Sequence, residues 1–214
     1  MTIKTHPGQS LLVDYENGTL PTAAGLTVAA HIETCEACRR TAARLRELGG
    51  HLIESIAPTA VDPGALEKTL ARLTERPVPI KARAMPLTVR GLPLPAAWAT
   101  VGLHPPRPFG PNYWIAHTRA AAAHGWRSFL VGAPASGEIA HHRHRGEEYV
   151  AVLEGSLNDG ERDYRAGDFI QSADGSAHTL KIGNDGRCVC LVAIEAPLTW
   201  SSPWVALLRP WIGV

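Results

Sequence analysis

Apolar residues near the amino terminus recur every three or four positions, a spacing that is typical of amphipathic helices. The longest stripe starts near Cys35 and is formed by Ala42, Leu45, Leu48, Leu52 and Ile56. The pair Gly49-Gly50 interrupts it and costs about 1 kcal/mol per glycine relative to alanine, so close packing against another helix is expected there. The pattern therefore predicts one long helix that packs closely against a neighbour.

Three shorter helices are predicted from start and stop signals around the long one. Ser10 is a candidate cap for the first helix, and Pro21 suits the first position of the second, which continues to about His31. Asp62-Pro63 is a start signal for the last helix. The apolar stripe of that helix is formed by Leu66, Leu70 and Leu73. Residues 1–80 are therefore expected to form a small domain of about four helices.

The periodicity changes to that of β-strands in the second half of the chain. Short apolar runs alternate there with turns that contain glycine, and the clearest runs are SFLVG, EYVAVLEG, DFIQSA and RCVCLVAI. Such a series of short strands is typical of a β-sandwich or barrel. Residues 95–214 are therefore expected to form an all-β barrel with a carboxyl-terminal tail.

Proline is dense between these two halves. Nine of the 17 prolines lie between Pro77 and Pro111. Because proline sustains neither a helix nor a central strand, residues 81–94 are predicted to be a semi-extended linker. The predicted fold class is therefore α+β in two domains, a helical domain followed by a β-barrel.

Composition excludes several classes of protein. A chain of 214 residues with 45 % hydrophobic content fits one large or two small globular domains. The formal net charge of +1 argues against direct binding of nucleic acid or of an anionic membrane surface. No apolar run approaches the roughly 20 residues of a membrane helix, and MTIKTHPGQS lacks the apolar core of a signal peptide. We therefore expect a cytoplasmic protein, in which closely spaced thiols favour metal or redox chemistry over disulfides.

The segment HIETCEACRR places an imidazole and two thiols, His31, Cys35 and Cys38, close together. Thr34 is a candidate cap for the long helix, whose dipole would favour thiolate over thiol. Thiolates and imidazole suit Zn²⁺, and a structural zinc site has four protein ligands. His6 and His51 are the candidates for the fourth ligand. We favour His6, because the irregular segment before the first helix can fold back over this corner.

A second cluster of ligand types lies in the β half. His142 and His144 are two apart and share one face of a strand, and Glu148 follows shortly after. A later segment supplies His178. Three imidazoles and a carboxylate fit Zn²⁺, Fe²⁺ or Mn²⁺. The neighbours His141 and Glu147 are expected to lie outside the site, and Cys188 and Cys190 are expected to be small buried residues rather than redox partners.

The first pattern resembles the zinc-containing anti-sigma factors. It consists of His31-x3-Cys35-x2-Cys38 with an upstream histidine at position 6, on a small helical domain. Members of that family bind an extracytoplasmic-function sigma factor and keep it from core RNA polymerase. The second pattern resembles the two cupin motifs, with Gly155 after the first ligands and Gly167 and Gly175 before His178. Departures from the usual cupin pattern are the position of Gly137, Ala173 in place of proline and Ile182 in place of asparagine.

The two patterns together resemble the ChrR-type anti-sigma factors. The resemblance implies a regulator that carries two Zn²⁺ ions per chain, restrains an extracytoplasmic-function sigma factor and releases it under singlet oxygen or organic peroxide stress. The rival interpretation is an enzyme, a cupin dioxygenase or isomerase with a helical appendage, because three histidines and a glutamate can also bind iron with open positions. A zinc-finger DNA-binding protein is disfavoured, because the predicted helices carry no concentrated basic face.

Overall fold

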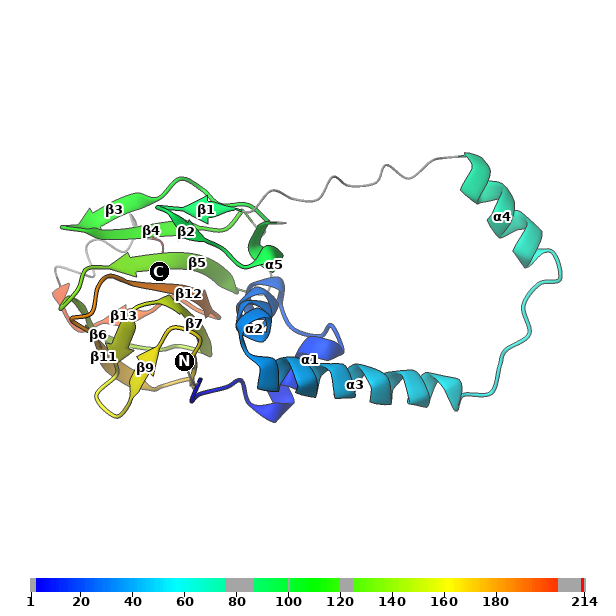
Figure 1. Ribbon diagram of the computed structural model, residues 1–214, viewed down its shortest axis with the longest axis horizontal. Helices are drawn as coiled ribbons and strands as arrows, with labels where there is room; N and C mark the ends of the chain where they lie inside the picture. The colour runs from blue at the N-terminus through cyan, green and yellow to red at the C-terminus, as the bar shows by residue number, and fades with distance from the viewer. Residues whose placement is uncertain (1–2, 76–86, 100, 120–124, 204–212, 214) are drawn as a thin grey trace.

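The computed structural model describes residues 3–75, 87–99, 101–119, 125–203 and 213 (Figure 1). A helical region precedes a region of antiparallel strands, so the expected α+β class is confirmed. No helix in these described ranges is long and apolar enough to cross a membrane. The helices are α1 (Gln9–Glu16), α2 (Thr22–Thr34), α3 (Glu36–Glu54), α4 (Ala65–Glu75) and a short α5 (Ala96–Ala99).

The β half contains two antiparallel sheets with a hydrophobic core between them. The six-stranded sheet has the order β10 (Phe169–Ser172), β7 (Glu148–Glu154), β12 (Cys188–Ile194), β5 (Arg127–Ala133), β4 (Tyr113–His117) and β3 (Arg107–Gly110). The five-stranded sheet has the order β13 (Thr199–Trp200), β6 (Glu138–Arg143), β11 (Ala177–Ile182), β8 (Ser156–Asn158) and β9 (Asp163–Arg165). All four strand runs singled out by the periodicity are strands, β5, β7, β10 and β12, and they lie in the same sheet.

Helix α2 lies between the six-stranded sheet and the pair α1 and α3 (Figure 1). Its buried face is rich in small side chains, including Ala24 and Ala30, which let the helix approach β7 and β12 closely. The indole of Trp98 on α5 is fully buried against α2 and donates a hydrogen bond from Nε1 to the Leu26 carbonyl oxygen at 3.0 Å. The helical half and the β half therefore share one continuous core.

Helix α3 is buried only near its start, at Cys38 and Ala42. Further along, Leu48 and Leu52 are 56 % and 60 % exposed. The expectation of close packing at Gly49-Gly50 is wrong, because a Cβ on either glycine would meet no atom within 4 Å. Figure 1 shows α3 pointing away from the β half and α4 standing apart from the other helices. The apolar stripes of both helices therefore face outward.

The segment expected to be a semi-extended linker contains regular structure where it is described. Strands β1 (Thr88–Val89) and β2 (Leu92–Pro93) form a hairpin, whose turn residues Arg90 and Gly91 both have positive φ angles of 50° and 84°. Two central residues with positive φ are typical of a tight two-residue hairpin turn. Residues 81–86 and the tail beyond Pro203, apart from Gly213, lie outside the described residues. The boundaries at 80 and 95 stay predictions.

Two predicted helix starts differ from the structure. Helix α1 begins at Gln9 with Gly8 as its N-cap residue and no side-chain cap, so the prediction that Ser10 caps it is wrong. Helix α4 begins at Ala65, and the Asp62 carboxylate accepts a hydrogen bond from the Gly64 backbone N–H at 2.9 Å. The start signal is therefore real, but it forms a turn before the helix.

Candidate metal centres

The first cluster lies at the corner where α2 ends and α3 begins. The structure brings His6, His31, Cys35 and Cys38 together, with one ligand atom of each within 4.8 Å of all the others. The His6 Nδ1 atom lies 3.4 Å from the Cys35 Sγ and 3.5 Å from the Cys38 Sγ. Ligands at zinc–sulfur and zinc–nitrogen distances of about 2.3 and 2.0 Å in a tetrahedron lie about 3.5 Å apart. The observed spacing therefore fits this donor set.

Local backbone geometry creates this corner. His31 lies in the last turn of α2, and Cys35 is the N-cap residue of α3 in an extended conformation. The prediction that Thr34 caps α3 is wrong, because its hydroxyl instead donates to the His31 carbonyl oxygen at 3.1 Å. His51 is exposed on α3, where its Nδ1 lies 3.5 Å from a Glu54 carboxylate oxygen, so it lies outside the cluster. The histidine that joins the cluster is His6.

Burial keeps His31 in the form that binds metals. The residue is 1 % exposed, and neither ring nitrogen has a hydrogen-bond partner among the described residues. Burial lowers the pKa of His31 to about 4, so the imidazole is neutral at pH 7. Burial, together with the nearby Cys35 thiol, raises the pKa of Cys38 to about 12 without a cation. Buried nitrogens without a hydrogen-bond partner are rare, and a bound metal ion would satisfy one of the two and stabilise the thiolates.

The second cluster lies inside the β half, on β6, β7 and β11 and on His144, which directly follows β6. The Nε2 atom of His178 on β11 is 3.0 Å from that of His142 and 3.3 Å from that of His144. The His144 Nε2 atom is also 3.7 Å from the Glu148 Oε2 atom at the start of β7. That carboxylate oxygen is buried and has no hydrogen-bond partner among the described residues. One ligand atom of each of the four residues lies within 4.8 Å of the others, so this donor set also fits a metal ion.

The strands orient these ligands as the alternation predicts. His142 and His144 are buried, and Arg143 between them is exposed. His142 pairs with His178 across β6 and β11. The Nδ1 atom of His142 lies 2.8 Å from the Ala140 carbonyl oxygen, so this nitrogen carries the proton and Nε2 is free to bind a metal.

The charge states of this cluster depend on its burial. Burial lowers the pKa of His142 to about 4 and that of His144 to about 3. Burial raises the pKa of Glu148 to about 8. A metal-free cluster therefore holds neutral imidazoles and a protonated carboxyl at pH 7, and a divalent cation would favour the carboxylate.

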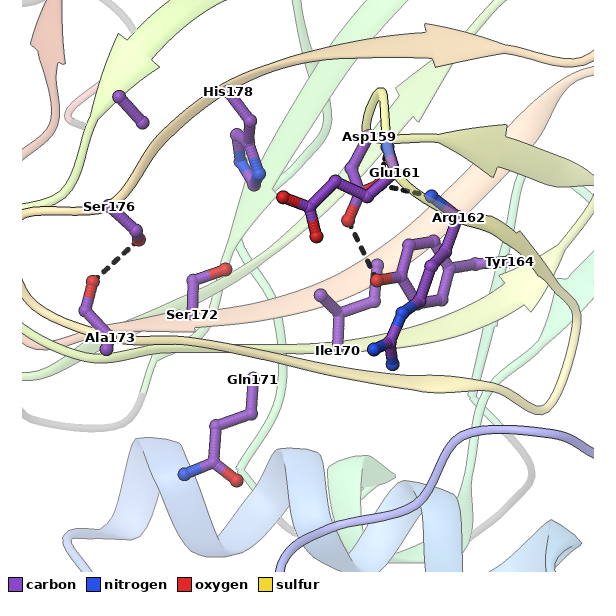
Figure 2. Close-up of a pocket in the computed structure, with 11 residues that line it drawn as sticks. Asp159, Glu161, Arg162, Tyr164, Ile170, Gln171, Ser172, Ala173, Ser176 and His178 are labelled. Carbon is purple, nitrogen blue, oxygen red and sulfur yellow. Dashed lines mark hydrogen bonds between the residues drawn. The ribbon is translucent and has the colours of Figure 1, made fainter.

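Two cavities flank the second cluster. A polar pocket of about 340 Å³ has His178 on its wall, together with Asp159, Arg162 and Tyr164 (Figure 2). The Tyr164 hydroxyl donates to Asp159 at 2.8 Å, which orders the far side of this pocket. A smaller apolar cavity of about 80 Å³ lies on the other side. Its lining includes Phe109, Phe129, Trp200, His142 and Glu148. His178 therefore borders the polar pocket, and His142 and Glu148 border the apolar cavity.

Residues that sequence analysis placed outside the second cluster lie outside it. His141 is exposed, and its Nδ1 atom lies 2.8 Å from the Ser201 hydroxyl oxygen. Glu147 accepts a hydrogen bond from the Tyr149 hydroxyl at 2.6 Å. Cys188 and Cys190 are buried on β12 with sulfur atoms 3.7 Å apart, as expected of small core residues that share a strand face.

Sequence reasoning missed two residues of the β half that approach the first cluster. The Phe169 ring packs edge-on against the His31 ring with centroids 5.5 Å apart. The Asp168 carboxylate accepts hydrogen bonds from the backbone just before His6. No local pattern in the sequence indicates these contacts, because the partners lie more than a hundred positions apart.

Comparison with known proteins places the chain in a family. The family model described as the ChrR cupin-like domain matches residues 105–196. The anti-sigma-E factor ChrR of Cereibacter sphaeroides is 33 % identical over 229 aligned residues, which cover all of both chains. The crystal structure of Rhodobacter sphaeroides SigE in complex with the anti-sigma ChrR matches at a TM-score of 0.73 and 31 % identity, covering 90 % of this chain and 100 % of that one.

Cupin enzymes match far more weakly. An acetylacetone dioxygenase from Acinetobacter johnsonii is 13 % identical, with a TM-score of 0.41, and the match covers 50 % of this chain and 85 % of that one. This identity is too low to support an enzymatic assignment. The end-to-end similarity instead supports the regulatory interpretation over the enzymatic one. This protein belongs to the ChrR family of anti-sigma factors.

Proposed function

We propose that this protein binds and inhibits an extracytoplasmic-function sigma factor through its helical region. The observation that carries the proposal is the outward-facing apolar surface of α3 and α4, called here the helical binding face. Its members are between 52 % and 72 % exposed, and they are Leu48, Leu52, Ile53, Ile56, Leu66, Leu70 and Leu73. Exposed apolar clusters of this kind mark interaction sites, because covering each leucine stabilises a complex by roughly 1.5–3 kcal/mol.

The occupant of this face is inferred from the family. The similar ChrR chain was crystallised with SigE, and that chain aligns with this one over nearly its whole length. Figure 1 shows the two helices of the binding face standing apart from each other. Their apolar side chains are exposed and open to a partner. A sigma factor is therefore the partner that both observations favour.

In this proposal His6, His31, Cys35 and Cys38 hold zinc and thereby set the angle between α2 and α3. Structural zinc contributes roughly 10–16 kcal/mol of apparent binding free energy in small peptides, so the corner gains much of its order from the ion. Helix α3 carries three of the seven residues of the binding face, and its N-cap residue and first turn supply two of the four ligands. Loss of zinc would therefore disturb the surface that holds the partner.

The second cluster is proposed to sense the signal. His142, His144, Glu148 and His178 would hold a second metal ion, with zinc as the favoured identity, and oxidative stress from singlet oxygen or organic peroxides would act there and release the sigma factor. Two features support this role. A polar pocket is lined by His178, and an apolar cavity is lined by His142 and Glu148, so a small molecule bound in either one would contact a proposed ligand.

The binding proposal is tested with one charge added to the binding face. Leu52→Asp places a carboxylate in the middle of the exposed stripe of α3, and it should reduce co-purification with the cognate sigma factor at least tenfold. Ala43→Asp is the matched control, because Ala43 is exposed on the same helix and lies on the opposite side from Leu52. Equal retention of the sigma factor by both variants would overturn the proposal.

A further inference from the structure

Residues 3–6 lie along the edge of the six-stranded sheet, and this segment is called here the amino-terminal strap. Asp168 accepts hydrogen bonds through Oδ1 from the backbone N–H groups of Lys4 at 2.7 Å and Thr5 at 3.1 Å. The Phe169 N–H donates to the Thr5 carbonyl oxygen at 3.2 Å. The strap ends at His6, the first residue of the first cluster. An edge strand of the β half therefore holds the segment that carries His6.

The strap is packed as well as hydrogen-bonded. Ile3 lies over Gly167, where a Cβ would come within 2.9 Å of the Ile3 Cγ1 atom. Gly167 also has a φ of +97°, a conformation that favours glycine. The absence of a side chain there lets the strap approach the turn that leads into β10.

Asp168 is built to hold this contact. Its side chain is 3 % exposed, and its second oxygen accepts a hydrogen bond from the Arg165 N–H at 2.9 Å. With both oxygens engaged, the carboxylate has a fixed orientation toward the strap. Charge-assisted hydrogen bonds of this kind are roughly twice as strong as neutral ones.

The β half also contacts the other imidazole of the first cluster. Phe169 packs edge-on against His31, and His31 lies in turn 5.6 Å from His6 between ring centroids. Cys35 is the N-cap residue of α3, and Cys38 lies in the first turn of that helix. The two histidines of the first cluster are therefore positioned with the help of residues 168–169.

Strand β10 connects this contact with the second cluster. Its last residue, Ser172, pairs with Glu148 on β7, and its first residue, Phe169, pairs with Ala151. The turn after β10 leads to His178 on β11. A strand of four residues thus touches the strap at one end and approaches two ligands of the second cluster at the other.

We propose that Asp168 is a positioning residue for the first metal centre: by holding the strap, it keeps His6 over the two thiols and slows the release of metal from them. The inference rests on the proposed metal-binding role of this cluster. In this proposal the β half affects the rate at which the first centre loses its metal. It does so through a contact that a mutation can remove without changing any ligand.

The test uses the full-length protein loaded with Co²⁺, whose thiolate-to-metal absorption reports only the centre that contains cysteine ligands. Asp168→Ala should accelerate transfer of Co²⁺ from this centre to a chelator by about 10- to 100-fold, the range found when a group that orients a metal ligand is removed. Asp168→Asn keeps an acceptor oxygen and should give an intermediate rate. Asp174→Ala, an exposed aspartate beyond β10, is the control and should leave the rate unchanged.

A second variant separates positioning from a general loss of stability. A chain without residues 2–4 lacks Ile3 and the Lys4 N–H, has the Met1 amine before Thr5, and keeps the Thr5 N–H, His6 and Asp168. If Asp168 acts through the strap, this deletion should also accelerate release, and combining it with Asp168→Ala should accelerate release by less than the product of the two separate effects. Amide exchange at Thr5, measured by NMR on the metal-free protein, should also rise in Asp168→Ala.

Unchanged Co²⁺ release in Asp168→Ala would overturn the inference, and so would fully additive effects in the combined variant. A failure of the proposed anti-sigma function would look different, because it would appear as loss of sigma co-purification with the order of metal-release rates preserved.

Discussion

His142 on β6 and His178 on β11 face each other across two paired strands, with their Nε2 atoms 3.0 Å apart. Because the other ring nitrogen of His142 donates to the Ala140 carbonyl oxygen, its Nε2 carries no proton. His144 directs a third imidazole nitrogen to the same point. Such convergence of three imidazole nitrogens is typical of a metal site, and it makes the second cluster a definite target for mutation.

Substitutions in the second cluster should separate sensing from binding. His178→Ala removes one ligand at the polar pocket and leaves α3 and α4 untouched, so sigma binding should persist and release under singlet oxygen should be lost. Reporter induction in cells that carry the variant, with protein abundance checked by immunoblot, measures this. His141→Ala is the control, because His141 is exposed outside the cluster. Normal induction by a soluble His178→Ala variant shown to lack the second metal would return the sensing role to the cysteines.

Loss of a thiolate should open the first centre. Cys35→Ser or Cys38→Ser should remove one equivalent of zinc per chain and abolish sigma binding, because both thiols lie at the corner that joins α2 to α3. Atomic absorption gives the zinc content, and co-purification gives the binding. Cys188→Ser changes a thiol on β12 outside both clusters and should keep both properties. Full inhibition by a metal-free Cys35/Cys38 double variant would contradict the prediction.

Acid should destabilise the metal-free protein through its buried histidines. His31 and His142 have pKa values of about 4 in the folded protein, and histidine titrates near pH 6.5 in an unfolded chain. The unfolded state therefore binds more protons between about pH 6.5 and 4, so the free energy of unfolding should fall as the pH falls through that window. Melting temperatures of chelator-treated protein across this range provide the measurement, and a flat profile would contradict it.

Glu148 should make the same metal-free protein less stable as the pH rises, which is opposite to the effect of the buried histidines. Its folded-state pKa of about 8 lies above the value of roughly 4.3 in an unfolded chain. Its contribution to stability is therefore fully present below about pH 4.3 and is lost as the pH rises toward 8. Glu148→Gln should remove this loss, so the variant should gain stability relative to wild type as the pH rises from about 5 to 8. An identical pH profile for both proteins would show that Glu148 is ionised when buried.

The shared core should make the helical half depend on α5. Trp98 is fully buried against α2, and Trp98→Ala should lower the free energy of unfolding by about 3–5 kcal/mol, since it leaves a large cavity and an unpaired Leu26 carbonyl. Trp98→Phe keeps most of the ring and should cost less. Urea unfolding followed by circular dichroism gives both values. A change below about 1 kcal/mol in Trp98→Ala would contradict this prediction.

Both donor sets were predictable from the sequence because most of their spacing is local. His31, Cys35 and Cys38 lie close together in the sequence, on either side of the corner between α2 and α3, and His142 and His144 are two residues apart at the end of β6. Short separation along the chain keeps the first three residues close, and the period of 2 in an extended chain places the two histidines on one side. The same local logic predicted the change from helices to strands.

Only the tertiary structure determined the features that depend on contacts between residues far apart in the sequence. It placed His6 rather than His51 at the first cluster, because Asp168 and Phe169 hold the strap that carries His6. It turned part of the expected linker into the hairpin of β1 and β2. It also added helix α5 at the start of the expected barrel, where Trp98 gains a buried position against α2. It left the stripe of α3 exposed, since no neighbouring helix covers Leu52 in the described part of the chain. An apolar stripe has the same pattern whether it meets its own core or a partner, so only the packing of the folded chain distinguishes the two.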